Sequence, residues 1–187
     1  MSEILHYGNT PMNKTMYHED RKILDREMLC AILDQSSTCC VGLHDTPYPY
    51  VVPMNFGYTW DKEEGLVIYL HMAQRGHRLS LLAQDPHGGI TVYTFYDRRG
   101  KKNFRGEAHD YRSVMVFGVA EEITEEADAL MALNQICLHT GRKGIKQIPP
   151  SERPRMRLFR VRAQEVIGKA QYPIAAVDEV PIPVFED

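Results

Sequence analysis

Hydrophobic and polar positions alternate along residues 49–58, which read PYVVPMNFGY. The intervening positions mostly hold smaller or polar residues, and large apolar side chains occupy every second place: Tyr50, Val52, Met54, Phe56 and Tyr58. Successive side chains of a β-strand point to opposite faces of its sheet. We therefore expect a strand with one face packed in a hydrophobic core and a second, narrower face.

Apolar runs of strand length recur along the rest of the chain, and turn sequences separate them. Residues 44–47 and 61–65 are predicted to be turns because they are rich in polar residues with Pro or Gly. Runs rich in β-branched and aromatic residues favour strands. The further predicted strands are 38–43, 66–70, 90–96, 113–123 and 156–167.

Three segments have apolar positions at helical spacing or helix boundary signals. The first has Asp20 as its expected N-cap, and its apolar positions are Leu24, Met28, Ala31 and Ile32. The second is a short helix over 78–84 that ends before Pro86. The third is expected to begin at Thr124 and to stop at Gly141, and its apolar stripe is Leu130, Leu133, Cys137 and Leu138.

Strand follows strand with links of hairpin length, and the predicted helices lie at the margins. This order favours a mainly β fold built as a closed antiparallel barrel over a parallel nucleotide-binding sheet. The chain has 187 residues and 43% hydrophobic content, which suffices for one sizeable core. We expect a single domain over 1–187, with an N-terminal arm at 1–19, an exposed charged loop at 97–110 and a C-terminal tail at 172–187.

Charge and cysteine content narrow the possible partners. The formal net charge of −3 provides no global positive field for nucleic acid or an anionic membrane. A signal peptide and a membrane-spanning run are both missing from the sequence pattern, so a cytoplasmic protein is expected. The four cysteines show neither metal-ligand nor disulfide-framework spacing. Reduced thiols and no metal site are therefore expected.

Familiar sequence motifs of catalysis are missing, but one local pattern points to an anion. The chain lacks a dinucleotide-binding glycine motif, a Walker-type loop and a Gly-x-Ser-x-Gly elbow. In LHMAQRGHRLSLL, residues 70–82, the residues Arg75, His77 and Arg78 gather where a helix begins. Cations there oppose the helix dipole unless an anion such as phosphate binds. As an isolated pattern, a solvated basic turn is the commoner explanation.

The order of several segments is also informative. DREMLCAIL, PYVVPMNFGY, LHMAQRGHRLSLL, YRSVMVFGVAEEI and LFRVRAQEVIGK together resemble the 5-nitroimidazole-resistance reductases within the pyridoxamine 5′-phosphate oxidase-like FMN proteins. The resemblance runs from about Asp20 to Lys169. It implies a six-stranded split β-barrel in a homodimer, with two FMN molecules in clefts between the subunits.

The resemblance also assigns site residues. It implies that the flavin ring lies along the strand backbone at Val52, Pro53, Met54 and Asn55. It places the flavin phosphate at Gly76, His77 and Arg78, and a second strand beside the cofactor at Ser113 and Val114. His71 is implied to lie close to the ring and to the substrate pocket. Two departures from the family are a loop at 97–110 without the cysteine common in relatives and a longer N-terminal arm.

The expected activity is electron transfer through FMN from a reductant such as NAD(P)H to a small planar acceptor, for example a nitroaromatic. His71 is the candidate proton donor or hydrogen-bonding residue at the acceptor, although without the resemblance a polar strand end is the favoured explanation. Two alternatives remain. The barrel could hold flavin, deazaflavin or haem without catalysis, or the basic stretch at 142–162 could bind nucleic acid.

Overall fold

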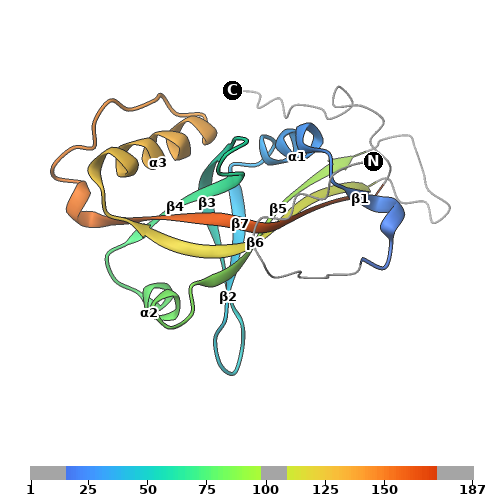
Figure 1. The fold of residues 1–187 in the computed structure, drawn as a ribbon, viewed down its shortest axis with the longest axis horizontal. Coiled ribbons are helices and arrows are strands. Elements are labelled where there is room, and N and C mark those ends of the chain that lie inside the picture. The colour runs from blue at the N-terminus through green and yellow to red at the C-terminus, as the bar shows by residue number, and fades with distance from the viewer. Residues whose placement is uncertain (1–15, 98–108, 172–187) are drawn as a thin grey trace.

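The computed structural model of the chain describes residues 16–97 and 109–171. These residues form one antiparallel sheet that curves into a barrel (Figure 1). Its strands are β1 (Lys22–Ile23), β2 (Thr38–Leu43), β3 (Tyr50–Trp60), β4 (Leu66–Ala73), β5 (His87–Asp97), β6 (His109–Ile123) and β7 (Met156–Ala170). The arm at 1–15, the loop at 98–108 and the tail at 172–187 lie outside the described residues.

Strand pairing closes the barrel. The order is β1-β7-β4-β3-β2-β5-β6, and β6 also pairs with β7, so the six strands from β2 to β7 form a ring. Every pairing in it is antiparallel. The expectation of a mainly β, six-stranded antiparallel barrel is confirmed.

Side chains of β3 alternate between the core and the outer face, as predicted. Met54 and Phe56 are buried inside the barrel, whereas Val51, Pro53 and Asn55 are exposed on its outer face. Inward side chains of the other strands complete this core, among them Leu66, Ile68, Ile90, Val92, Val114 and Val116. Burial of these side chains supplies most of the free energy that holds a domain of this size together.

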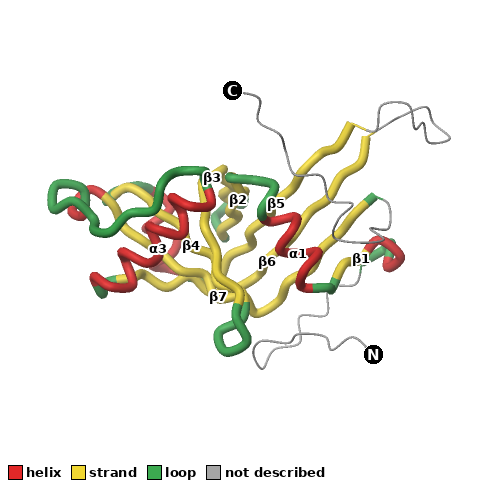
Figure 2. The backbone as a smooth tube through the Cα atoms, turned by 90° about the horizontal axis from the view of Figure 1, so that it is seen from above, coloured by secondary structure: helices red, strands yellow, loops and turns green. Residues whose placement is uncertain are grey.

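Three helices flank the barrel: α1 (Arg26–Leu33), α2 (His77–Gln84) and α3 (Glu126–His139). In Figures 1 and 2, α1 and α3 lie on one side of the barrel with the end of β3 between them, and Figure 1 shows α2 on the opposite side. A second, smaller core lies under α3, where Val67, Tyr69 and Leu158 of the barrel meet Ala129, Ala132 and Ile136 of the helix.

The start of α1 differs from the prediction. Asp25, not Asp20, is the N-cap, and its Oδ1 accepts a hydrogen bond of 3.0 Å from the backbone of Met28. The preceding residues form a 3₁₀ turn (Glu19–Arg21) and β1, in which Ile23 pairs with Gly168 of β7. Pairing with β7 therefore overrides the local cap signal at Asp20.

The start and the buried face of α3 also differ. Glu125 rather than Thr124 occupies the N-cap position. The buried residues are Ala129, Ala132 and Ile136, whereas Leu138, in the predicted stripe, is 50% exposed. The reason is a close approach to Gly57 of β3, where a Cβ atom would lie 2.5 Å from the backbone of α3. Small residues allow this contact. The helix does stop as expected, because Gly141 has a φ of 74°.

Candidate functional site

Strand β4 carries His71 on the outer face of the barrel. Its inward residues Leu66, Ile68, Leu70 and Met72 are buried, while His71 is exposed. The strand continues three residues beyond the predicted range of 66–70, because His71, Met72 and Ala73 pair with β7. His71 therefore lies within a paired strand, which holds its backbone in place, rather than at a loose strand end.

The electrostatic surroundings of His71 are positive. Crowding by neighbouring protein atoms, which removes water from the ring, lowers the pKa of His71, and the charges of Arg142 and Arg78 lower it further. A neutral imidazole is thus the dominant form near pH 7. From the sequence, Arg142 belongs to a basic stretch and not to this site, since nothing local shows where the chain goes after Gly141.

Residues Gln74 to Gly76 form the turn between β4 and α2. Gly76 is the N-cap of α2 with a φ of 142°, and a Cβ atom there would meet nothing within 4 Å. Glycine is therefore required by the backbone conformation and not by crowding. The cap provides no side-chain hydrogen bond, and the first turn of α2 holds no acidic residue. Backbone N–H groups at this helix start remain available to an anion.

The basic residues of this turn have different surroundings. His77 Nε2 donates a hydrogen bond of 2.7 Å to Asp45 Oδ2, and this bond holds the pKa of Asp45 below its usual range. Arg78 is partly buried and lines a small apolar cavity of about 20 Å³ inside the barrel. Arg75 is exposed. The predicted basic turn is present, with His77 already engaged by a carboxylate from the β2–β3 loop.

The residues expected along the flavin ring divide between the two faces of β3. Val52 and Met54 point inward, and Met54 is part of the core. Pro53 and Asn55 face outward, and Asn55 Nδ2 donates to the Ser37 carbonyl at 3.1 Å. The paired part of β3 and β4 ends at Phe56 and Leu70, and Asn55 and His71 are the next residue of each strand, both exposed. The two predicted residues thus adjoin the same end of this pairing.

Ser113 and Val114 lie elsewhere on the same barrel. They belong to β6, which is separated from β3 by β2 and β5. Ser113 is half-buried, and Val114 is fully buried with its side chain in the core. Within one chain, the structure does not bring these two residues to the His71 and Gly76 region.

An apolar face of the barrel is left uncovered by helices in the described part of the chain. Val51 of β3 is 62% exposed and Tyr93 of β5 is 53% exposed. Between them lies the outward side of β2, whose Cys40 pairs with Pro53 on one side and Thr91 on the other. Exposed apolar surface of this kind is typical of an interaction site.

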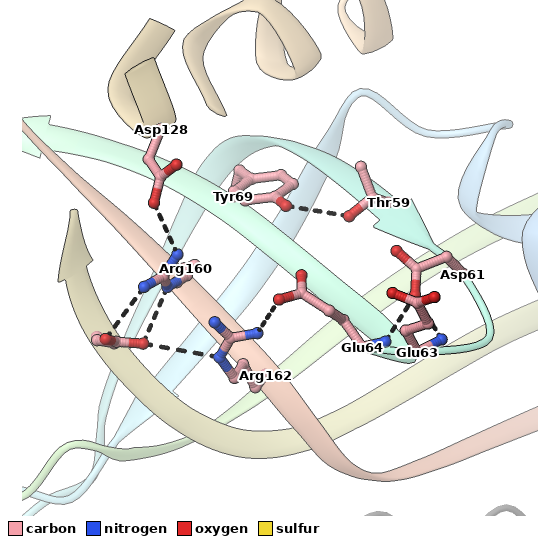
Figure 3. Close-up of polar contacts among 9 residues, drawn as sticks. Thr59, Asp61, Glu63, Glu64, Tyr69, Asp128, Arg160 and Arg162 are labelled. Carbon is pink, nitrogen blue, oxygen red and sulfur yellow. Dashed lines mark hydrogen bonds and ion pairs between the residues drawn. The ribbon is translucent and has the colours of Figure 1, made fainter. Parts of the chain in front are cut away.

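The basic stretch at 142–162 is largely neutralised in its later half. Arg160 forms hydrogen bonds of 2.9 and 3.1 Å to Glu121, and a third of 3.1 Å to Asp128. Arg162 pairs with Glu64 at 3.0 Å (Figure 3). Arg157 likewise donates to both carboxylate oxygens of Glu122. These guanidinium groups are committed to carboxylates, which disfavours nucleic-acid binding by this surface.

Three further features of the described residues bear on function. Within residues 16–97 and 109–171, no group of three or more His, Cys, Asp or Glu side chains is arranged to hold a metal ion. All four cysteines lie in this part, and each is a free thiol. No helix in these segments is long and apolar enough to cross a membrane.

A closed antiparallel barrel, with a basic glycine-capped helix start beside a surface histidine, defines a split-barrel protein with a candidate anion site. Residues 25–170 match the pyridoxamine 5′-phosphate oxidase family, and the chain belongs to that family. Among curated proteins, none matches the chain.

Solved structures share the fold. A candidate 5-nitroimidazole antibiotic resistance protein from Bacteroides thetaiotaomicron is 26% identical, with a TM-score of 0.64 over 80% of this chain and 86% of that chain. The flavocytochrome Anf3 from Azotobacter vinelandii is 19% identical, with a TM-score of 0.62 over 91% and 79%. An FAD and haem binding protein from Mycobacterium smegmatis is 19% identical, with a TM-score of 0.61 over 86% and 78%.

Proposed function

We propose that this protein is an FMN-dependent oxidoreductase that reduces a small acceptor such as a nitroaromatic compound. The observation that carries the proposal is the start of α2, where Gly76 exposes backbone donors among basic side chains and no acidic residue lies in the first turn. Each uncompensated cation at a helix N-terminus costs about 0.3–1 kcal/mol. A bound phosphate is attracted both to the basic side chains and to the positive end of the helix dipole, so it makes this arrangement favourable.

The residues around this turn fit FMN. Its phosphate would bind the N–H groups of α2 and Arg78, while His77 is already hydrogen-bonded to Asp45. Asn55 and His71, both exposed where the pairing of β3 with β4 ends, would contact the ring. Bound FMN supplies the hydride and electron chemistry, and the protein positions the ring and shields it from water.

His71 would act on the acceptor as a neutral imidazole. Because desolvation and two nearby arginines lower its pKa, the ring carries no charge near pH 7. It then serves as a hydrogen-bond donor to an acceptor that gains negative charge, and as a full proton donor only in more acidic solution.

The similar structures support this proposal at different levels. The Bacteroides protein is named for 5-nitroimidazole resistance, which supports a nitroaromatic acceptor. The names of the other two refer to FAD, haem or a flavocytochrome, which supports a flavin in this fold more broadly. Those two names also favour a second candidate function, a carrier of flavin or haem without turnover of its own.

We further propose that the chain forms a homodimer with FMN between its subunits and that NAD(P)H is a candidate electron donor. The uncovered apolar face around Val51 and Tyr93 supports the dimer, since a second copy would remove it from water. Ser113 of one subunit could then approach the flavin held by the other.

The test is spectroscopic. The full chain is titrated with FMN, FAD and haem, the flavin complex is reduced anaerobically with NADPH, and a nitroaromatic acceptor is added. We expect about one FMN per chain and rapid reoxidation by the acceptor. A stable flavin or haem complex that shows no such reoxidation would establish the carrier function instead.

A further inference from the structure

A second pocket, of about 550 Å³, opens between α1 and α3. It exists because β2 pairs with β3 only from Tyr50 to Asn55, so the last part of β3 has no strand on that side and faces the two helices. Figure 2 shows this end of β3 between α3 and α1. Tyr58 and Trp60 of β3 contribute aromatic surface to the pocket.

This pocket is separate from the basic turn at α2. Tyr50, at the other end of β3, contacts His77 with ring centroids 5.5 Å apart. From Tyr50 to Tyr58 an extended strand spans about 26 Å. Figure 1 places α2 on the opposite side of the barrel from α1 and α3. A ligand here would therefore occupy a different place from a phosphate at Gly76.

The charge of the pocket is negative. Among the described residues that line it, Asp34 carries the formal charge. Tyr58 OH donates a hydrogen bond of 2.7 Å to Asp34 Oδ1, which orients the carboxylate and leaves Oδ2 for another donor. The same contact, together with desolvation, raises the pKa of Tyr58, so its hydroxyl stays protonated and continues to donate.

His139 adds a neutral ring to the same wall. Its Nε2 lies 2.9 Å from the Ser36 carbonyl, which only accepts, so Nε2 carries the hydrogen and Nδ1 is an acceptor. Desolvation lowers the pKa of His139 and keeps the ring uncharged. The ring packs against Phe56 and Tyr58, with centroids 4.3 and 5.5 Å away.

Arg26, whose charge acts on the pocket residue Cys30, is already engaged by other groups. Arg26 of α1 donates to the Trp60 carbonyl, and its guanidinium lies 5.7 Å from the centroid of the Trp60 ring. Asp34 is hydrogen-bonded to Tyr58. An oriented carboxylate, π faces and acceptor atoms together suit a cation with an apolar body.

We propose that the pocket between α1 and α3 binds a small organic amine, with its ammonium group on Asp34 and its apolar part against Tyr58 and Trp60. The site stands independently of the flavin function, since it shares no residue with the basic turn. It gives the protein a second ligand, of opposite charge to a phosphate.

The test compares two probes of the same shape. Binding of 2-phenylethylamine and of its neutral counterpart 2-phenylethanol to the full chain is followed by ligand-observed NMR. We expect the amine to bind about two- to fivefold more tightly, because Asp34 is exposed and water screens its charge. Asp34→Asn keeps an acceptor for Tyr58 but removes the charge, and it should abolish this preference, with little effect on the alcohol.

Two controls make the result decisive. Glu152→Gln removes an exposed carboxylate outside the pocket and should leave both probes unchanged. Leu138 lies at the pocket and is 50% exposed, so Leu138→Arg and Leu138→Glu alter the local charge without disturbing the core. The arginine variant should weaken amine binding and the glutamate variant should strengthen it, even if Asp34→Asn fails to fold. Equal binding of amine and alcohol, or no response to charge at Leu138, would overturn the proposal.

Discussion

Arg78 combines two environments in one side chain. Arg78 lines the apolar cavity inside the barrel together with Leu82 and Met72. It also belongs to the first turn of α2, where the anion site is proposed. Long basic side chains often bury their methylene stem and keep the charged end in water. A useful substitution must therefore remove the charge and keep the stem.

Arg78→Met satisfies that condition. We expect it to raise the dissociation constant of FMN about ten- to a hundredfold, because a charged hydrogen bond to phosphate contributes about 1.5–3 kcal/mol. Riboflavin, which lacks the phosphate, should bind equally to both proteins. Quenching of flavin fluorescence measures both constants. Arg155→Met, at an exposed arginine paired with Glu152, is the matched control. If FMN and riboflavin lose affinity equally, Arg78 has a structural role only.

His71 is the second residue whose function can be separated from its structural role. We expect His71→Gln to retain FMN but to slow reoxidation of the reduced flavin by a nitroaromatic, by about 10²- to 10⁴-fold if the ring transfers a proton. Because surroundings lower the pKa of His71 from 6.5, the wild-type rate should rise only as the pH falls below that value. The variant should show no such rise.

Stopped-flow mixing of the anaerobically reduced protein with the acceptor measures this rate across pH. His87→Gln, at a surface histidine bonded to Asp85, is the control and should behave as the wild type. Equal rates for wild type and His71→Gln, or loss of flavin from the variant, would refute the catalytic role.

At the scale of elements, the contact between α3 and β3 limits how the barrel is covered. Gly57 meets the backbone of Gln135 and Ile136 so closely that a Cβ atom would lie 2.5 Å away. Because the contact is between the backbone of the strand and the backbone of the helix, it has little room for adjustment. The helix therefore packs directly on the strand, with its small alanine side chains in the contact.

Gly57→Ala should destabilise the protein by about 1–3 kcal/mol, the usual cost of overpacking. The matched control is Gly42→Ala in β2, where a Cβ atom would meet only Gly89 O at 3.6 Å. Urea unfolding followed by circular dichroism compares the free energies of unfolding. Similar stability of the two variants would show that α3 can shift away from β3 at little cost.

These contacts explain what the sequence could predict and what it could not. The alternation over 49–58 is local, so it predicted β3 and its buried face correctly. The orientation of α3 depends on Gly57, which lies far away in sequence, so the larger leucines misled the prediction. Likewise, the basic turn at Gly76 is a local motif, whereas the Asp45 partner of His77 and the Arg142 charge near His71 arise only from the tertiary fold.

A histidine ties two elements together and makes stability depend on pH. His139, the last residue of α3, donates to the Ser36 carbonyl just after α1, and desolvation lowers its pKa. Folding thus favours the neutral ring. The stabilisation is fully present above the unfolded pKa of about 6.5 and is lost as the pH falls below it toward the folded value.

We expect the free energy of unfolding to decrease between pH 7 and pH 5, and this decrease should be smaller in His139→Gln. His71, whose pKa is also lowered, makes the free energy of unfolding decrease in the same direction, so part of the decrease remains in the variant. Carboxylates such as Glu121 and Glu122, whose pKa values are lowered by arginine partners, act at more acidic pH. Identical slopes in wild type and variant would contradict the assignment to His139.

At the scale of the whole molecule, the barrel has two contrasting outer surfaces. One, around β6 and β7, is covered by ion pairs of Arg157, Arg160 and Arg162 with carboxylates. The other, across β3, β2 and β5, exposes Val51 and Tyr93. A charged, internally paired surface stays in water at little cost, whereas an apolar one gains from burial. The contrast supports the proposal that the β3–β2–β5 face is a dimer interface.

Val51→Glu tests this interface, because a dimer would have to bury an unpaired carboxylate there. Light scattering at micromolar concentration should give a dimer for the wild type and a monomer for the variant, with unchanged circular dichroism. FMN should bind more weakly to the monomer if the partner subunit completes the site. Met131→Glu, at an exposed apolar residue of α3, is the control and should remain dimeric. A wild-type protein that is monomeric with flavin bound would place the flavin site within one chain. A Val51→Glu variant that stays dimeric would place the interface on another face.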